Sequence, residues 1–247
     1  RKERVYVSLA PSFVSEYPDA SPFAVVAALE RLGFAGVSET ALGAEVVAAY
    51  ERAHPPGLPC SVRISSACPA VVELVRKYYP GLSGCISSAL SPALTHARML
   101  REWYGDDIGV VFVSPCIAKK KEADDHPELI DVAITFDDLA VWLEQAKIPL
   151  AYLDDAGASF VPFRSSRGAS LPVEGGLVGN VRSISDDPLP ARAVSISGIG
   201  EVRATLDEIA SDAPPEPMLL ELLACTGGCI NGPRHARSSG RIRRMDA

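Results

Sequence analysis

The sequence lacks any long hydrophobic run and any excess of basic charge. No stretch reaches the roughly 20 uninterrupted apolar residues that a membrane span needs, and the first residues do not have the pattern of a signal peptide, so we expect none. The net charge is −7, which argues against a nucleic-acid surface as the main function. The basic segment 234–244 is the local exception, and we interpret it as a solvated terminus. We therefore expect no membrane span and no nucleic-acid partner.

The sequence also lacks the cysteine spacing of a secreted disulfide scaffold. Its six cysteines are irregularly spaced over 247 residues, which favours a cytoplasmic, metal-binding protein. A ferredoxin-like Cys-x₂-Cys-x₂-Cys run is missing too, so electrons would have to come from a segment or partner outside this sequence. The four histidines are isolated, which is more typical of structural or solvated side chains than of ligands; they are His54, His96, His126 and His235.

What the sequence does contain is an alternation of short apolar runs and amphipathic segments. Its length allows one large domain or two lobes, each with a core. Runs rich in β-branched residues predict strands at 5–10, 34–37, 62–64, 109–113, 132–135 and 193–199. Helical periodicity predicts helices at 22–32, 41–53, 70–78, 91–103, 136–145 and 201–209. This alternation indicates an α/β fold.

Four of the cysteines lie at the ends of predicted strands or beside glycines. Cys68 and Cys116 each follow a strand and adjoin a proline, while Cys225 and Cys229 flank a glycine pair. Open α/β sheets bind ligands at the carboxyl ends of their strands, and thiolates are soft ligands that suit iron–sulfur clusters. Spacing alone leaves two interpretations open, a cluster site and four buried structural cysteines.

The other two cysteines, Cys60 and Cys85, are typical of buried structural residues. Lys119 lies three residues after Cys116, where its ammonium group could bind an anion at the site. Glu122 could relay protons if it is partly buried. The alternative for both charged residues is a solvated surface.

Three segments carry a resemblance to a known family. Residues 65–69 read Ser-Ser-Ala-Cys-Pro, 114–122 read Ser-Pro-Cys-Ile-Ala-Lys-Lys-Lys-Glu, and 221–233 read Glu-Leu-Leu-Ala-Cys-Thr-Gly-Gly-Cys-Ile-Asn-Gly-Pro. In this order they resemble the active-site domain of [FeFe]-hydrogenases, which holds the H-cluster. The family's segments are Thr-Ser-Cys-Cys-Pro, Met-Pro-Cys-x-x-Lys-x-x-Glu and Glu-x-Met-x-Cys-x-x-Gly-Cys-x-x-Gly-Gly-Gly. The flanking segments 10–12 and 174–176 also fit, so the resemblance covers nearly the whole chain.

The resemblance implies a cofactor and a set of residues that bind it. It implies that a [4Fe–4S] cluster is held by Cys68, Cys116, Cys225 and Cys229, and that Cys229 bridges to a di-iron unit carrying CO, cyanide and a bridging dithiolate. Lys119 would hydrogen-bond one cyanide. The implied cofactor-binding positions are Ala10, Pro11, Ser114, Pro115, Lys119 and Leu223. The implied reaction is the reversible conversion of two protons and two electrons into H₂.

The resemblance also implies the architecture and the partners. We expect two lobes, each a twisted, mainly parallel sheet flanked by helices, with the cluster in the cleft between them. We place the first lobe at 1–105, with 210–247 contributing ligands, and the second at 106–209. The chain opens with Arg1, so we expect it to be a piece of a longer protein. The implied partners are a ferredoxin-like electron carrier or fused iron–sulfur domain, di-iron maturation proteins and a signalling domain.

The departures from the family pattern concern proton transfer. Ala67 stands where catalytic members carry a proton-transfer cysteine, so the resemblance implies low activity. Ser114 and Leu223 replace methionines. Glu122 and Ser87 match the family's acidic relay, while a further relay carboxylate falls near His54. The remaining departures are Ala93, which replaces a glutamine, and Pro233, which ends the glycine run. This pattern resembles the sensory members; the alternatives are a non-catalytic iron–sulfur protein of the cytosolic assembly type and a structural domain without a cluster.

Overall fold

The computed structural model describes residues 2–57, 60–150, 153–189, 191–212 and 214–235. Its strands are β1 Val5–Leu9, β2 Gly36–Glu39, β3 Val62–Ile64, β4 Gly109–Ser114, β5 Val132–Thr135, β6 Arg192–Ser197 and β7 Met218–Leu223. Its α-helices are α1 Phe13–Glu16, α2 Pro22–Arg31, α3 Ala41–Ala53, α4 Pro69–Tyr78, α5 Pro92–Tyr104, α6 Ala118–Asp125, α7 Phe136–Gln145, α8 Gly176–Arg182 and α9 Ile199–Ser211. Short 3₁₀ helices include η1 Pro80–Cys85, η3 Arg167–Ser170 and η4 Cys229–Asn231.

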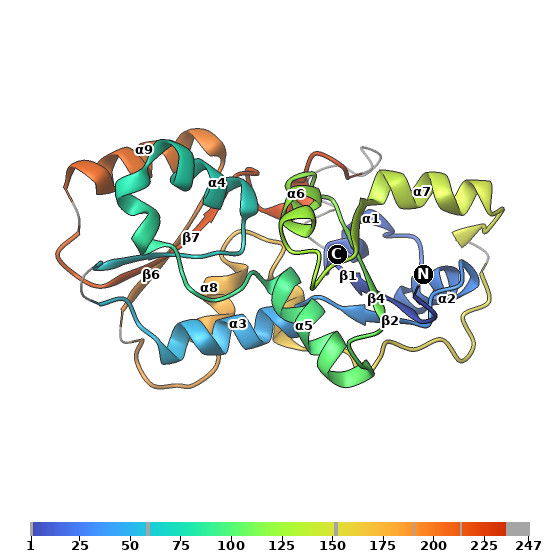
Figure 1. The fold of residues 1–247 in the computed structure, drawn as a ribbon. Coiled ribbons are helices and arrows are strands. Elements are labelled where there is room, and N and C mark those ends of the chain that lie inside the picture. Colours follow the sequence, from blue (N-terminus) through green and yellow to red (C-terminus); the bar gives the residue numbers. More distant parts are fainter. Residues whose placement is uncertain (1, 58–59, 151–152, 190, 213, 236–247) are drawn as a thin grey trace.

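The strands form two parallel sheets, one in each lobe (Figure 1). The first has the order β2-β1-β4-β5 and the second the order β3-β7-β6, and every pairing within them is parallel. All six residues of β4 are buried, as expected for a central strand covered on both faces. The predicted α/β fold with two mainly parallel sheets is therefore confirmed.

Apolar faces of the helices bury both sheets. In the first lobe, residues of α2, α5 and α7 join the strands in one core. In the second lobe, α4 and α9 pack on one face of the sheet, while α3 and α8 pack on the other. Helix α3 thus leaves the first sheet after β2 and contacts the second, which ties the lobes together (Figure 1). Gly43 is required here, because a Cβ atom on it would lie 2.3 Å from the carbonyl oxygen of Pro92 in α5.

The predicted division of the chain into lobes is wrong. Strand β3 falls within 1–105 but pairs in the second sheet, whereas β4 and β5 fall within 106–209 but pair in the first. The chain passes from the first sheet to the second after β2, returns for β4, and crosses again before β6. Because parallel strands are joined by long crossover connections, neighbours in a sheet need not be neighbours in the sequence.

Cys60 and Cys85 form a disulfide, which the sequence analysis did not predict. Their Cα atoms are 5.7 Å apart, although 25 positions separate them in the sequence. The backbone N–H of Ser87 donates to the carbonyl of Ile64 at 2.7 Å, so the segment after η1 runs beside β3. This pairing of segments brings the two cysteines together. Among the described residues, no helix is long and apolar enough to cross a membrane.

Candidate functional site

A pocket lies where the carboxyl ends of strands from both sheets meet. It is lined by the segments that follow β1, β3, β4 and β7, as expected for ligand sites of open parallel sheets. It encloses about 860 Å³ outside the protein atoms, part of it open to solvent. Most of the lining is apolar, with a few polar groups, as is typical of ligand pockets.

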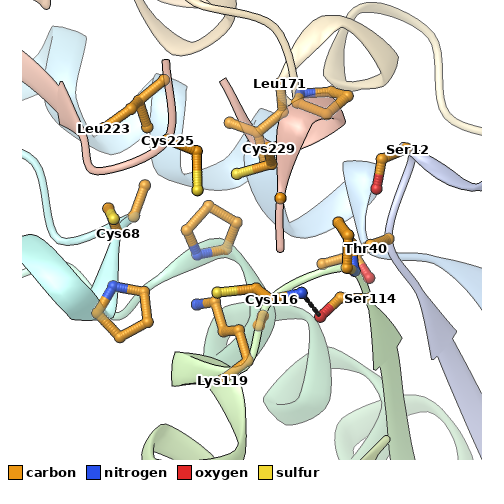
Figure 2. A pocket seen from close by; sticks show the side chains of 18 of the residues that line it. Ser12, Thr40, Cys68, Ser114, Cys116, Lys119, Leu171, Leu223, Cys225 and Cys229 are labelled. Carbon is orange, nitrogen blue, oxygen red and sulfur yellow. Dashed lines mark hydrogen bonds between the residues drawn. The ribbon is translucent and has the colours of Figure 1, made fainter. Parts of the chain in front are cut away.

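The four cysteines singled out in the sequence all line this pocket. Cys68 immediately precedes α4, whose first residue is a proline, and Cys116 follows β4 by two residues. Cys225 follows β7 by two residues, and Cys229 begins η4. Figure 2 shows their sulfur atoms around one common space. Cys116 comes from the first sheet, whereas Cys68 and Cys225 come from the second.

The loop that carries Cys229 depends on two glycines. Gly228 has φ +99°, and a Cβ atom on it would lie 2.4 Å from the carbonyl oxygen of Pro172. Gly232 packs so closely that its Cβ atom would lie 2.9 Å from the carbonyl oxygen of Pro115. The loop therefore docks on residues 172–174 through Gly228 and on the segment that presents Cys116 through Gly232, and a side chain at either position would disturb that contact.

Burial and mutual repulsion disfavour free thiolates in this pocket. Burial raises the pKa of Cys225 to about 11, with smaller contributions from Cys116 and Cys68. Burial also raises the pKa of Cys229 well above its usual value. It raises the pKa of Cys116 as well, and the positive charge of Lys119 opposes that shift. Four thiols held this close need a positively charged partner before they can all ionise. Iron ions supply such charge.

The four thiols that line the pocket fit a [4Fe–4S] cluster, which cysteine thiolates hold. Within the described ranges, no three His, Cys, Asp or Glu side chains are arranged around one metal ion. Cysteines that each bind a different iron of a cluster lie farther apart than ligands of one ion. Ser12 gives a second indication, because its buried hydroxyl lines the pocket and has no partner among the described residues. A bound group with lone pairs would satisfy it.

A sequence profile described as "Iron only hydrogenase large subunit, C-terminal domain" matches residues 3–233. The chain belongs to this family. The [FeFe]-hydrogenases of the family carry the H-cluster, which comprises a [4Fe–4S] cluster and a di-iron subcluster.

Among curated proteins, Iron hydrogenase 1 of Clostridium pasteurianum is 28% identical over 260 residues, covering 84% of this chain and 44% of that protein. The "Periplasmic [Fe] hydrogenase large subunit" of Nitratidesulfovibrio vulgaris is 26% identical over 275 residues, covering 90% of this chain and 64% of that protein. The chain thus spans less than two thirds of either relative.

Solved structures show the same fold. A variant of the [FeFe]-hydrogenase HydA1 from Chlamydomonas reinhardtii matches with a TM-score of 0.75 and 21% identity, covering 99% of this chain and 82% of that one. HydA(deltaEFG), from a study of stepwise H-cluster assembly, matches with a TM-score of 0.74 and 20% identity over the same shares of the two chains.

In this member of the hydrogenase family, two side chains hold the ammonium group of Lys119 in place. Its Nζ atom lies 2.5 Å from Oε2 of Glu122 and 3.1 Å from Oγ of Ser91, and the side chains of Lys119 and Glu122 are each 10% exposed. The solvated alternative for these two residues is therefore wrong. Sequence reasoning missed Ser91 as a partner of Lys119, although Ser91 also caps α5.

The other predicted binding positions lie around the same hydrogenase-type pocket. The residues concerned are Ala10, Pro11, Ala67, Ser114, Pro115 and Leu223. Ser114 accepts a hydrogen bond from the backbone N–H of Cys116 at 3.3 Å (Figure 2). Ala67 has no polar side-chain atom, so its Cβ offers the pocket neither a donor nor an acceptor.

Sequence reasoning missed one buried acidic residue of helix α3. Glu51 is buried in α3, accepts a hydrogen bond from the hydroxyl of Ser87, and pairs with Arg63 at 3.7 Å. Burial raises the pKa of Glu51, while Ser87 and Arg63 oppose the shift. Its helical spacing with the apolar positions of α3 could have signalled this burial. His54, the position assigned from the sequence, is exposed and stacks on Tyr50 instead.

Proposed function

We propose that this chain is an [FeFe]-hydrogenase domain that binds an H-cluster and interconverts H₂ with protons and electrons slowly, in an H₂-sensing role. One observation carries the proposal: four cysteines surround one pocket whose lining includes Ala67 where the resemblance places the proton-transfer cysteine. The site thus combines the residues needed to hold the cofactor with a weakened route for protons.

The four thiolates are proposed to hold the cluster. Cys68, Cys116, Cys225 and Cys229 would bind the [4Fe–4S] part, with Cys229 shared with the di-iron unit. When bound, the H-cluster would provide the centre at which H₂ is formed or split and would pass the two electrons from or to the electron carrier. Lys119 would orient a cyanide ligand through one ammonium proton, because Glu122 and Ser91 hold its Nζ atom in place.

We propose that proton transfer by the side chains of this protein is the slow step of turnover. Glu51 is suited to holding a proton, because burial raises its pKa and Ser87 fixes its carboxyl group. Ala67 cannot carry a proton between such groups and the pocket. General acid–base transfer by a side chain contributes roughly 10²- to 10⁴-fold to a rate, which sets the scale of the expected loss.

The remaining aspects of the function are part of the same proposal. We propose that the chain belongs to a longer protein, that a ferredoxin-like carrier or fused iron–sulfur domain delivers electrons, and that a signalling module receives the output. Maturation proteins would supply the di-iron unit. A cytoplasmic location remains a prediction, and one curated relative is named as periplasmic.

The test is an infrared spectrum of the chain after anaerobic cluster reconstitution and loading with the di-iron unit. We expect CO and cyanide bands that change between an H₂ and an inert atmosphere, together with slow H₂ turnover. Cys229→Ser serves as the matched control and should lose these bands. Cubane iron without CO or cyanide bands would favour a non-catalytic iron–sulfur protein, and bands with neither turnover nor an H₂ response would overturn the proposal.

A further inference from the structure

A series of buried polar side chains, joined by hydrogen bonds, leads from the core of the first lobe to the cofactor pocket. The Ser38 hydroxyl lies 2.9 Å from Nε2 of His96, and Nδ1 of the same ring lies 2.7 Å from the Ser8 hydroxyl. The Ser8 hydroxyl lies 2.8 Å from that of Thr40. Ser8, Ser38 and His96 are fully buried, and Thr40 is 3% exposed. Thr40 lines the pocket, so the series of hydrogen bonds ends there.

The imidazole ring of His96 is neutral. Burial alone lowers the pKa of His96 to about 3, so the imidazole carries no charge near neutral pH. In a neutral ring one nitrogen donates a hydrogen bond and the other accepts one. The tautomer of His96 therefore sets the direction of every hydrogen bond in this series.

The two possible directions differ in where they leave a proton unpaired. If Nε2 of His96 carries the proton, it donates to Ser38, whose own hydroxyl proton then has no acceptor among the described residues. If Nδ1 carries the proton, Ser38 donates to Nε2, His96 donates to Ser8, and Ser8 donates to Thr40. The second direction places the unpaired proton at the pocket, where a bound group can accept it. Leaving it inside the core is unfavourable.

We infer that Ser38, His96 and Ser8 orient the Thr40 hydroxyl as a hydrogen-bond donor to the group bound in the pocket. Thr40 lies on the same side of the pocket as Ser12 and Ser114, across from Cys68 (Figure 2). The acceptor it would take is a small lone-pair ligand, such as a diatomic or dithiolate atom of the cofactor. The identity of that acceptor rests on the proposed function, whereas the direction of the hydrogen bonds in the series does not.

The direction is tested by nitrogen-15 NMR of the full chain labelled in its four histidines, before and after cofactor loading. The His96 signal is recognised because it disappears in His96→Phe. We expect Nδ1 to be protonated, and we expect Ser38→Ala to shift the ring towards the Nε2-protonated form. An Nε2-protonated ring in the unsubstituted chain would overturn the inference, whether or not the protein binds the cofactor.

The donor is tested by infrared spectra of the loaded chain. Thr40→Val keeps the shape of the side chain but removes the hydroxyl, so at least one CO or cyanide band should shift. Thr40→Ser keeps the hydroxyl and should leave the bands in place. Unchanged bands in Thr40→Val would overturn the donor role. A chain that shows no such bands would refute the proposed function instead, and the NMR result would then decide the direction alone.

Discussion

The disulfide between Cys60 and Cys85 leads to a quantitative prediction about stability. The double substitution Cys60→Ser/Cys85→Ser opens a loop of 25 residues in the unfolded chain. The chain-entropy estimate for a loop of this length is about 3 to 4 kcal/mol of lost stability at 25 °C. The structure adds a local effect, because Cys60 lies two residues before β3 and the loop after β3 presents Cys68.

The assay has two parts. Thiols are first alkylated under denaturing, non-reducing conditions after iron is removed, and are counted by mass spectrometry. Four cysteines should react before reduction and six after it, because four are free in the fold and two are paired. Denaturant unfolding of the unsubstituted chain with and without a thiol reductant then gives the stability difference.

The double-serine variant provides the control, since reductant should not change its stability. Six reactive thiols before reduction would refute the disulfide itself. A variant as stable as the unsubstituted chain would refute the loop argument. A confirmed disulfide would also weaken the predicted cytoplasmic location, because cytosolic thiols are usually kept reduced.

Three further predictions concern the site and its surroundings. Ala67→Cys should raise H₂ turnover of the loaded chain by roughly 10²- to 10⁴-fold, while Ala70→Cys, which also faces the pocket, should not; equal rates would count against the proton-transfer reasoning. Cys116→Ala should lower the iron content after reconstitution, as measured by metal analysis, and unchanged iron would exclude Cys116 as a ligand. Because burial lowers the pKa of His96 to about 3, the unfolded chain binds more protons than the folded one below pH ~6.5. Its stability should therefore fall by about 1.4 kcal/mol per pH unit from that value towards pH 3, and His96→Gln should remove this contribution in denaturant titrations.

The fold class and the cysteine site were accessible from the sequence because local patterns encode them. The run 109–113 is apolar enough to be a buried strand, and Cys116 follows it by three residues. Strand ends of a parallel sheet meet at one edge, so residues there gather without further information. The motifs around Cys68 and Cys229 supplied the rest.

The features that the sequence did not reveal depend on contacts between distant segments. The residues of a strand do not specify which of the two sheets it joins, so the predicted lobe boundaries are wrong. The pairing of Cys60 with Cys85 depends on the approach of two segments far apart in the sequence. His96 was interpreted as an isolated histidine, because its partners Ser8 and Ser38 lie on strands 88 and 58 residues away.

The lobes contribute unequally to the thiol set, which has a consequence for the lifetime of the protein. Cys116 belongs to the first lobe, whereas Cys68 and Cys225 belong to the second. In the part of the chain that the structure describes, the two sheets share no strand pairing. Helix α3 already ties the lobes together, and a cofactor bound by all these thiols would add a second connection between them. A ligand that binds the folded form lowers the population of opened forms on which proteases act, so the cofactor-loaded protein should resist proteolysis better than the cofactor-free protein.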